Sequence, residues 1–507
     1  MALYKQNDEI TTVHEALVAK NEFIGARGSF DGIVTYEDAK ERLPKPIWDG
    51  HESHLACYDK AWELAFSNLC EPSKESGFVS SFIDTAFNGC LFMWDSSFIL
   101  MFTKYADRIF KFQKTLNNLY CHQHEDGFIC REIEEKSGCD RFTKHDVSST
   151  GPNIMGWSEW EYYLNFSDKK RLEKVFYPLL AYHRWLRKNR TWRDGTYFSS
   201  GWGCGMDNLP RLEPRYHCCF DHGHMVWLDA CMQMLLSCKT LINMARELSV
   251  VEFIPELEEE KSHLESIIND TLWDEADGFY YDRYRNGSFN GVRHVGAFWA
   301  LIAECASADR AERMIERLTD ENEFNTPFPI PALTKSHPDF SADGGYWRGG
   351  VWAPTTYMVL KGLDNYGKSA LAHSIAKKHL DAVTDVFKRE GTLFENYAPE
   401  RIDGDFSQGG QSKADFVGWT GLSPIAVLFE FVFGIKPFAS EKRIVWNVEL
   451  LERHGIEKYP FGADGELTLI CEARSDSSEE PKITAKSNVP VTLEVVWDDG
   501  KKKTLTL

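Results

Sequence analysis

Between about residues 50 and 435, apolar positions repeat with a period near 3.6 residues, which is typical of amphipathic helices. From His54 to Leu69, leucines, alanines and aromatic residues fall mostly on one face. Strands preceding each helix are missing from the pattern, which disfavours a TIM barrel or a Rossmann sheet. The pattern predicts about twelve helices, over His54–Leu69, from Ser96, and near 107–123, 153–165, 168–189, 222–248, 255–274, 292–303, 307–318, 349–363, 367–389 and 417–434.

After about residue 438 the pattern changes to alternating apolar and polar residues with many β-branched side chains. Residues 1–50 show turns and one short helical stretch from Thr12 to Lys20. We therefore expect an N-terminal arm over 1–50, a helical domain over 51–437 and a β-rich appendage over 438–507. The strands expected in this appendage are Arg443–Leu451, Glu466–Glu472, Lys482–Ala485 and Val489–Trp497, followed by a hairpin turn at Asp498–Gly500.

Composition argues against several functional classes. Lys and Arg number 57 against 77 Asp and Glu, and the resulting net charge of −20 argues against nucleic acid or an anionic membrane as a partner. No segment has the roughly 18 consecutive apolar residues of a membrane span, and the first twenty residues are charged where a signal peptide is apolar. The 13 cysteines are odd in number and scattered, so we expect free thiols and a cytoplasmic location.

Aromatic residues are the unusual feature of the composition. The chain has 16 Trp, 19 Tyr and 33 Phe, together 13% of its residues. Because indole rings stack on the flat C–H faces of sugars, this content is a first indication of carbohydrate. Aromatic residues, glycines and carboxylates concentrate in four stretches, Asn88–Phe98, Ser200–Arg211, Gly344–Thr356 and Thr392–Gly404.

The first two stretches each contain a candidate aspartate with a plainer alternative role. Asp95 follows Trp94 directly, and it is either a functional carboxylate or only the N-cap of the helix expected from Ser96. Asp207 follows apolar Met206, and it is either a desolvated general acid or part of an Asx-turn. Desolvation raises the pKa of a carboxyl toward the range that a general acid needs.

The other two stretches contain aromatic clusters. Tyr346, Trp347 and Trp352 flank Arg348, and they form either the wall of a binding site or a tryptophan-rich corner of the core. Glu395 lies among aromatic residues, and it is either a catalytic carboxylate or a surface charge. Two carboxylates on separate loops fit glycoside hydrolysis, in which one protonates the leaving oxygen while the other attacks the sugar or activates water.

Several motifs follow one another in order across about residues 50–435, and together they resemble the trehalase-like clan of (α/α)6-barrel glycosidases. The resemblance is closest to glycoside hydrolase family 63, in the subgroup of bacterial mannosylglycerate and glucosylglycerate hydrolases. The motifs are Phe92-Met93-Trp94-Asp95-Ser96, Ser149-Thr150-Gly151-Pro152-Asn153 with Gly156-Trp157, Gly205-Met206-Asp207-Asn208-Leu209-Pro210-Arg211, Tyr346-Trp347-Arg348-Gly349-Gly350-Val351-Trp352, Phe394-Glu395-Asn396-Tyr397 and Gly418-Trp419-Thr420.

This resemblance implies an all-α (α/α)6 toroid, or six-hairpin barrel, with a small C-terminal β appendage. It assigns the general acid to Asp207 and the general base to Glu395, and it makes Asp95 an ionised acceptor of sugar hydroxyls. The substrate-binding residues that it implies are Trp94, Asp95, Trp157, Arg211, Tyr346, Trp347, Arg348, Trp352, Tyr397 and Trp419. The chain departs from the family near the acid, at Asn153, Gly203, Cys204 and Leu209, which leaves the substrate open.

The function predicted is an inverting, exo-acting α-glycosidase for a small α-glucoside or α-mannoside, with no metal or organic cofactor. Inversion implies carboxyls roughly 6.5–9.5 Å apart. Two alternatives stay open. A sugar isomerase, epimerase or lyase on the same toroid would be indicated by His217 with His222 or His224 at the pocket, and an inactive carbohydrate-binding protein is disfavoured by the presence of both carboxylates. His222 and His224, two residues apart on an expected helix, should diverge and not bind a metal.

Overall fold

The computed structural model describes residues 14–28, 30, 32–85, 88–407, 410–416, 418–498 and 500–507. The start of the helix expected from Thr12, the charged residues up to position 13 and Asp499 in the expected hairpin turn lie outside the described residues. Among the described residues, none of the helices combines the length and the apolar character that crossing a membrane requires.

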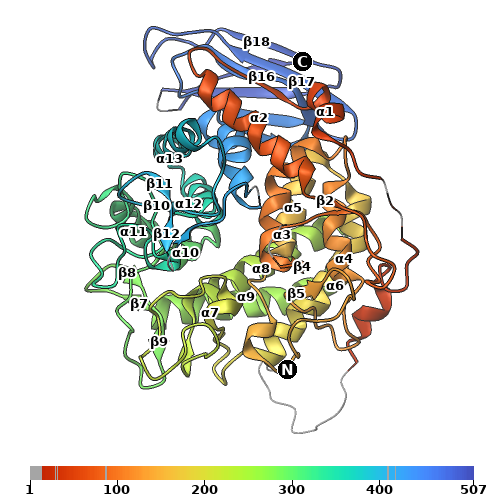
Figure 1. The fold of residues 1–507 in the computed structure, drawn as a ribbon, viewed down its shortest axis with the longest axis vertical. Coiled ribbons are helices and arrows are strands. Elements are labelled where there is room, and N and C mark those ends of the chain that lie inside the picture. The colour runs from red at the N-terminus through yellow and green to blue at the C-terminus, as the bar shows by residue number, and fades with distance from the viewer. Residues whose placement is uncertain are drawn as a thin grey trace.

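Helices dominate the structure between residues 52 and 432, as the periodicity predicts (Figure 1). Most of the predicted helices occur with ends within a few residues of the expected ones. The longer helices are α2 (Glu52–Ser67), α3 (Met93–Thr103), α5 (Met155–Phe166), α6 (Lys169–Asn189), α8 (Leu228–Leu248), α9 (Ile254–Thr271), α11 (Ala308–Thr319), α12 (Ala353–Asn365), α13 (Ser369–Glu390) and the π-helix η10 (Ser423–Val432).

Three predicted helices are interrupted or shortened in the structure. The segment 107–123 is interrupted and contains only the 3-10 helix η4 (Phe112–Leu116) and the short α4 (Asn117–Tyr120). The segment 292–303 is divided into η7 (Val295–Phe298) and α10 (Trp299–Ile302). Helix α8 begins at 228 instead of 222, because the preceding residues form strand β6 (Met225–Val226), which pairs with β9 (Arg283–Tyr284).

Helix α3 begins earlier than predicted, so Asp95 is not its N-cap. Strand β4 (Cys90–Phe92) leads directly into the helix, and Phe92 is the capping residue. The N–H of Met93 donates to the carbonyl of Arg131 at 2.8 Å, where β4 pairs with β5 (Glu132–Glu134). Asp95 therefore lies inside the first turn of α3, with its carboxyl available for another role.

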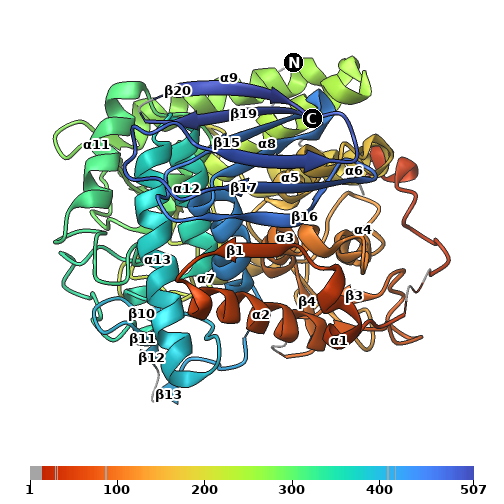
Figure 2. The same ribbon diagram turned by 90° about the horizontal axis from the view of Figure 1, so that it is seen from above.

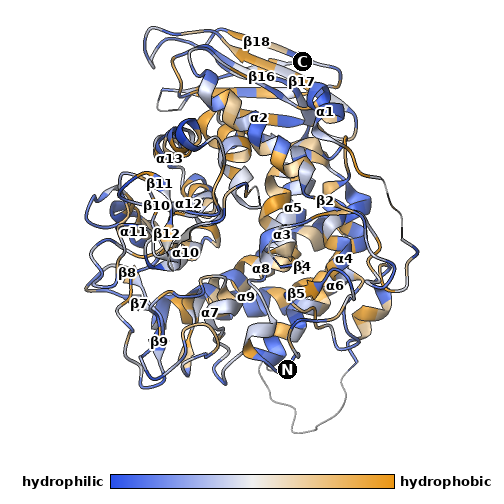
Figure 3. Ribbon diagram, in the orientation of Figure 1, coloured by the Kyte–Doolittle hydropathy of each residue, from blue (hydrophilic) through white to orange (hydrophobic). Residues whose placement is uncertain are grey.

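The helices pack in succession around the centre of the molecule (Figure 1). Contacts join α3 to α5, α5 to α8, α6 to α8, α8 to α10, α10 to α12, and α12 to α13. Helix α13 in turn contacts α2 and η10, so the last helices of the chain meet the first. Hydrophilic residues lie on the outward side of α13, whereas apolar residues run along α5 (Figure 3).

Two four-stranded sheets lie over one side of the helices (Figure 2). The terminal hairpin is formed as predicted, since β19 pairs antiparallel with β20. Strands β1, β14 and β16 were not expected, and β1 brings part of the N-terminal segment into a C-terminal sheet. In spatial order, the first sheet consists of β1 (Lys45–Trp48), β16 (His454–Phe461), β17 (Gly465–Cys471) and β18 (Ile483–Ser487). The second consists of β14 (Ile435–Phe438), β15 (Arg443–Asn447), β19 (Thr492–Trp497) and β20 (Lys501–Thr506).

Buried carboxylates in the helical core are paired with cations. Glu430 on η10 accepts hydrogen bonds from Tyr105 and Tyr357, both at 2.8 Å. Its two oxygens also lie 3.0 Å from the ammonium groups of Lys104 and Lys361. Because a buried charge is costly without partners, this network satisfies the charges where the helices meet.

Candidate active site

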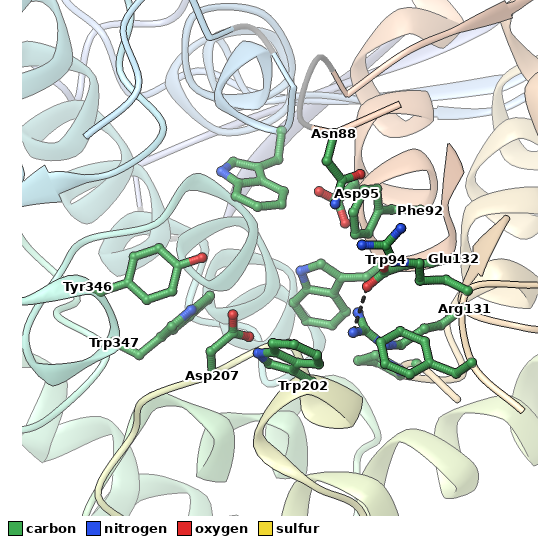
Figure 4. Close-up of a pocket in the computed structure, with 16 residues that line it drawn as sticks. Asn88, Phe92, Trp94, Asp95, Arg131, Glu132, Trp202, Asp207, Tyr346 and Trp347 are labelled. Atoms are coloured by element: carbon green, nitrogen blue, oxygen red, sulfur yellow. Dashed lines mark ion pairs between the residues drawn. The ribbon is translucent and has the colours of Figure 1, made fainter. Parts of the chain in front are cut away.

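A cavity of about 390 Å³ opens among the loops that carry the predicted motifs. Figure 4 shows Asp95, Trp94, Asp207 and Tyr346 pointing toward the same space. Its size is within the range of small-molecule sites. The residues that line it are Asn88, Phe92, Trp94, Asp95, Arg131, Glu132, Arg141, Phe142, Gly151, Pro152, Trp202, Gly205, Asp207, Tyr346, Trp347 and Trp419. Six of the predicted site residues, from four separate motifs, are therefore brought together.

The loop that presents Asp207 depends on two glycines. The short helix α7 (Gly201–Cys204) has Ser200 as its N-cap, and the Ser200 hydroxyl accepts from the Gly203 N–H at 3.0 Å. Its C-cap is Gly205, with a φ of +76°. A Cβ on Gly201 would lie 2.2 Å from the carbonyl oxygen of Cys218 and 2.5 Å from that of Asp207. Only glycine permits this close approach, so the glycines of the motif are needed to turn the chain before Asp207.

The electrostatics of Asp207 suit a proton donor. Burial raises its pKa from 3.8 to about 6, with the charge of Glu132 adding to the rise and that of Arg131 opposing it. A carboxyl with such a pKa is protonated in a useful fraction of molecules near neutral pH. The Asx-turn alternative gives no reason for that shift.

Glu395 lies beside the cavity and is not among the residues that line it. It is 8% exposed, and burial followed by the charge of Asp207 raises its pKa from 4.5 to about 7. The charge of Glu395 in turn acts on Asp95 and on Tyr346, which both line the cavity. Its backbone carbonyl accepts from the indole of Trp419, which lines the cavity, and its side chain is buried, so the surface-charge alternative is wrong.

The backbone around Glu395 is held by neighbouring loops. Its N–H donates to the carbonyl of Lys413 at 2.9 Å, and its carbonyl accepts from the indole N–H of Trp419 at 2.9 Å. The N–H of Phe394 donates to the hydroxyl of Tyr397 at 3.2 Å. These bonds fix where the glutamate side chain begins, while none of them occupies its carboxylate.

Several buried polar atoms at the site have no protein partner within the described residues. At the cavity wall they are Oδ1 of Asp95 and the indole nitrogen of Trp94. Buried groups are normally satisfied, so such atoms point to a polar ligand. Burial, with the charges of Glu132 and Glu395 adding, raises the pKa of Asp95 well above its usual range. This favours the protonated carboxyl instead of the expected ionised one, and it leaves Asp95 able to donate as well as accept.

Amide and carboxyl groups join the three loops that form the site. The side chain of Asn208 donates to the carbonyl of Gly345 at 3.0 Å and accepts from the N–H of Trp347 at 2.8 Å. Buried Asp405 accepts from the N–H of Tyr346 at 2.8 Å and also from the side chain of Asn396. Asn208 therefore connects the Asp207 loop to the aromatic loop, and Asp405 connects that loop to the segment after Glu395.

The aromatic wall has two layers. Trp347 and Trp352 stack with centroids 4.0 Å apart and planes 2° apart, and only Trp347 reaches the cavity. The ring of Trp419 lies edge-on to Trp352 at 5.6 Å, and that of Tyr346 lies edge-on to it at 5.0 Å. Trp352 supports the residues that touch the cavity, so both the binding-wall and the core-corner interpretations apply to this segment.

Two residues predicted to bind substrate lie in the core instead. Trp157 on α5 is absent from the cavity wall, and its indole N–H donates to Glu161 at 3.1 Å. Arg211 is buried, and its guanidinium forms ion pairs with Asp229 at 2.6 Å and Asp282 at 2.7 Å. Because these partners occupy the donor groups, we correct both predictions to structural roles.

Two further predicted residues also lie away from the cavity wall. Arg348 is partly exposed, lies 3.7 Å from Asp339 and is not among the residues that line the cavity. Tyr397 is buried and uses its hydroxyl to accept from the backbone of Phe394. Arg348 is therefore corrected to a surface residue, and Tyr397 to a residue that positions the segment containing Glu395.

The sequence prediction missed the charged side of the cavity. Arg131 and Glu132 form an ion pair of 2.6 Å there, and the Arg131 guanidinium lies over Phe142 at 4.8 Å and Trp202 at 5.7 Å (Figure 4). Trp202 lies in the stretch Ser200–Arg211 and could have been proposed from it. Arg131 and Glu132 lie between the motifs, and pairing of β4 with β5 brings them to the site.

Histidines do not form the pair that the isomerase alternative requires. Among the described residues, no histidine lines the cavity. His222 and His224 precede α8 in a loop, and their rings are 4.6 Å apart, so the prediction that they diverge is wrong. The ring of His222 lies edge-on to Trp192 at 5.3 Å, away from the cavity-lining residues.

Comparison with known proteins agrees with this arrangement. The chain matches the family model of the mannosylglycerate hydrolase MGH1-like glycoside hydrolase domain over residues 91–413, which is more than half of its length. An uncharacterized protein of Borreliella burgdorferi is 26% identical over 419 residues, covering 81% of this chain and 85% of that protein.

Two further similar proteins have named activities. A probable mannosyl-oligosaccharide glucosidase of Schizosaccharomyces pombe is 24% identical over 354 residues, covering 64% of this chain and 40% of that protein. The crystal structure of a family 63 mannosylglycerate hydrolase from Thermus thermophilus, in complex with glucose, has a TM-score of 0.58 at 22% identity. That match covers 73% of this chain and 99% of the other. The protein thus belongs to the mannosylglycerate hydrolase MGH1-like family, among the family 63 and trehalase-like enzymes, and it is a glycoside hydrolase.

Proposed function

We propose that this glycoside hydrolase is an inverting, exo-acting α-glycosidase for a small α-glucoside or α-mannoside. The observation that carries the proposal is the pair Asp207 and Glu395, two carboxyls with raised pKa values on separate loops beside one aromatic cavity. The loops holding them are joined through Asn208 and Asp405.

In the proposed mechanism Asp207 protonates the glycosidic oxygen, and Glu395 removes a proton from the water that attacks the opposite face of the sugar. The charge of Asp207 raises the pKa of Glu395, and the active form of the pair has one proton, on Asp207. Because the pKa of Asp207 is about 6 and that of Glu395 about 7, this form is a minority of the singly protonated pair. Asp95 and the indole N–H of Trp94 offer hydrogen-bonding groups to the sugar hydroxyls. Trp347 and Trp419 offer flat apolar surfaces.

The proposal extends to the architecture and location. The succession of helices that closes with α13 against α2 supports an (α/α)6 toroid of six hairpins. We keep the division into an arm over 1–50, a catalytic domain over 51–437 and a β appendage over 438–507 as part of the proposal, with β1 pairing into the appendage. All 13 cysteines are free thiols, which supports a reducing, cytoplasmic compartment.

The substrate class rests on the similar proteins. Two of the similar proteins are named as a mannosylglycerate hydrolase and a probable mannosyl-oligosaccharide glucosidase, and the first of these was solved in complex with glucose. A cavity of about 390 Å³ has room for a small saccharide. We therefore propose glucose or mannose as the sugar to be released.

The deciding experiment follows the first-formed anomer by NMR during hydrolysis of α-linked disaccharides and glycosylglycerates. We expect β-sugar from the native enzyme, because inversion places water on the face opposite the leaving group. Asp207→Asn and Glu395→Gln should each lower kcat by about 10²–10⁴-fold with the fold intact. Asp339→Asn, a matched change at the exposed surface, should leave kcat unchanged. An α product, or near-native turnover in either catalytic variant, would reject the mechanism.

The pH dependence provides a second test. We expect kcat/KM to rise as pH increases through about 6, the lower pKa of the two carboxyls, because a doubly protonated pair has no base. It should fall as pH increases through about 7, when the last proton leaves the pair and the acid is lost. The measurement is initial rate against pH in the native enzyme, and a flat profile between pH 5 and 8 would contradict the coupled pair.

A further inference from the structure

The loop that follows the Asp207 segment contains three adjacent residues with metal-binding atoms. One ligand atom each from His217, Cys218 and Cys219 lies within 4.8 Å of the other two. The sulfurs of Cys218 and Cys219 are 3.8 Å apart. The sequence prediction did not foresee this group, because it took the cysteines as scattered free thiols and considered only His222 and His224 as a metal pair. None of these residues lines the cavity or enters the proposed mechanism.

We propose that His217, Cys218 and Cys219 form a binding site for a soft divalent cation, with Zn²⁺ as the representative ion. Thiolates and imidazole are the ligands that such ions prefer. Two sulfurs bound at about 2.3 Å to a tetrahedral Zn²⁺ lie roughly 3.8 Å apart, whereas those of a disulfide lie about 2.05 Å apart. The observed spacing therefore matches two ligands of one ion. This inference goes beyond the proposed hydrolysis and does not depend on it.

The surroundings leave the group accessible and hold it in shape. His217 is exposed, and both cysteines are partly exposed, so an ion can enter from solvent, and water can provide the fourth ligand. The N–H of His217 donates to Asp221 at 2.7 Å, and its ring stacks on Phe220 with centroids 4.3 Å apart. These contacts orient the three residues without using the sulfur atoms.

A second group with similar spacing shows why the loop is preferred. His183, Cys238 and Glu260 also lie within 4.8 Å of one another and are fully buried. There the guanidinium of Arg187 lies 3.0 Å from Glu260, so a cation already neutralises the carboxylate. A metal ion at this cluster would have to displace the guanidinium of Arg187 from Glu260. No such positive group is paired with His217, Cys218 or Cys219 among the described residues.

The proposed site is connected to the cavity. The carbonyl of Cys219 accepts from the N–H of Trp202 at 3.0 Å, and the ring of Phe220 lies edge-on to Trp202 at 4.5 Å. Trp202 lines the cavity on α7, just before Asp207. An ion bound by this loop would therefore fasten it against the segment that presents the general acid.

Metal binding by the reduced protein tests the proposal. The native chain is kept reduced, cleared of metal with a chelator, and titrated with Zn²⁺ by equilibrium dialysis and with Co²⁺ by absorption spectroscopy. We expect one ion per chain and a sulfur-to-cobalt charge-transfer band. Cys218→Ser and Cys219→Ser should each remove that band or weaken it, and they should lower Zn²⁺ affinity by more than about tenfold, because a ligand is lost. His217→Ala should lower affinity similarly.

Cys139→Ser is the matched control, because Cys139 is an exposed thiol outside the group. It should bind as the native chain does. Circular dichroism melting of each variant without metal shows that the fold persists, and these readouts need no substrate, so they stand even if the proposed hydrolysis fails. Absence of stoichiometric Zn²⁺ binding by the native chain, or unchanged binding in Cys218→Ser and Cys219→Ser, would overturn the site.

Discussion

The carboxylates of the helical core and those of the cavity behave in opposite ways, although burial acts to raise the pKa of both sets. Burial alone would raise the pKa of Glu430, yet the charges of Lys104 and Lys361 outweigh it and lower the pKa to about 2. Glu260 has the same low pKa, because His183 and Arg187 outweigh its burial. These core carboxylates are ionised at every physiological pH, and they serve to join helices.

At the cavity, the charges of nearby cations do not cancel the rise in carboxyl pKa that burial causes. Asp207 and Glu395 have pKa values of about 6 and 7, and burial also raises the pKa of Asp95 well above its usual range. Arg131 is the cation that lowers the pKa of Asp207, and its guanidinium is itself paired with Glu132. The difference in pKa between the regions therefore follows the supply of cations, and it leaves the cavity carboxyls able to exchange protons.

Removing a core carboxylate is the strongest test of this comparison. Glu430→Gln leaves the two buried lysines without their common partner, so we expect it to lower the free energy of unfolding by about 3–5 kcal/mol. The difference from the native chain should shrink as pH falls from about 4.5 toward 2, where the native glutamate is itself protonated. Urea denaturation measures both effects.

Glu37→Gln serves as the control for this substitution. Glu37 is paired with Lys40 at the surface with its side chain 74% exposed, so its loss should cost less than about 0.5 kcal/mol. If Glu430→Gln cost no more than Glu37→Gln, the lysines would not depend on the glutamate, and the distinction between the regions would fail.

The Asp207 loop is joined to the aromatic loop by a side-chain amide, a connection that Asn208→Ala tests. Its amide makes both bonds that connect the Asp207 loop to residues 345–347. We expect kcat to fall by about 10–100-fold with a smaller change in KM, because small displacements of a catalytic group are costly. Asn286→Ala in an exposed turn is the control, and its kcat should not change. Native kcat in Asn208→Ala would show that other contacts hold the acid.

The sequence predicted the features that depend on neighbouring residues. The helical period located the ring of helices, and the glycine–aromatic motifs located Asp207, Trp94 and Tyr346 at the cavity. It could not predict Arg131, because the short strands β4 and β5 pair across a gap in sequence. The sequence prediction also placed Arg211 wrongly, because its partner Asp282 lies 71 residues away in the chain. A motif shows which residues are neighbours in sequence, and it does not show where a side chain points.

Neutralising a cavity carboxyl should stabilise the fold. Both Asp207 and Glu395 have raised pKa values in the folded state, so the folded protein binds their protons more tightly and native stability falls as pH rises from about 4 through 7. Asp207→Asn and Glu395→Gln should therefore raise the free energy of unfolding by about 1–2 kcal/mol at pH 8, and by less at pH 5. Denaturation at both pH values measures this. A loss of stability at pH 8 would mean that unseen cations pair with these groups.

The smallest expected effect on stability and KM distinguishes Trp94, which lines the cavity, from Trp157, which packs in the core. Trp157 gives its indole N–H to Glu161 and lies 5.8 Å from Phe98 in the core, whereas Trp94 lines the cavity with its N–H unused by the described residues. Trp157→Phe removes one hydrogen bond, so we expect about 1 kcal/mol of lost stability and a change in KM below about twofold. Trp94→Phe should raise KM more, because a donor to the sugar is lost. Steady-state kinetics on the best substrate of the panel compares the two variants. A larger KM effect at Trp157 than at Trp94 would mean that substrate reaches past the wall into the core, where the paired carboxylates lie.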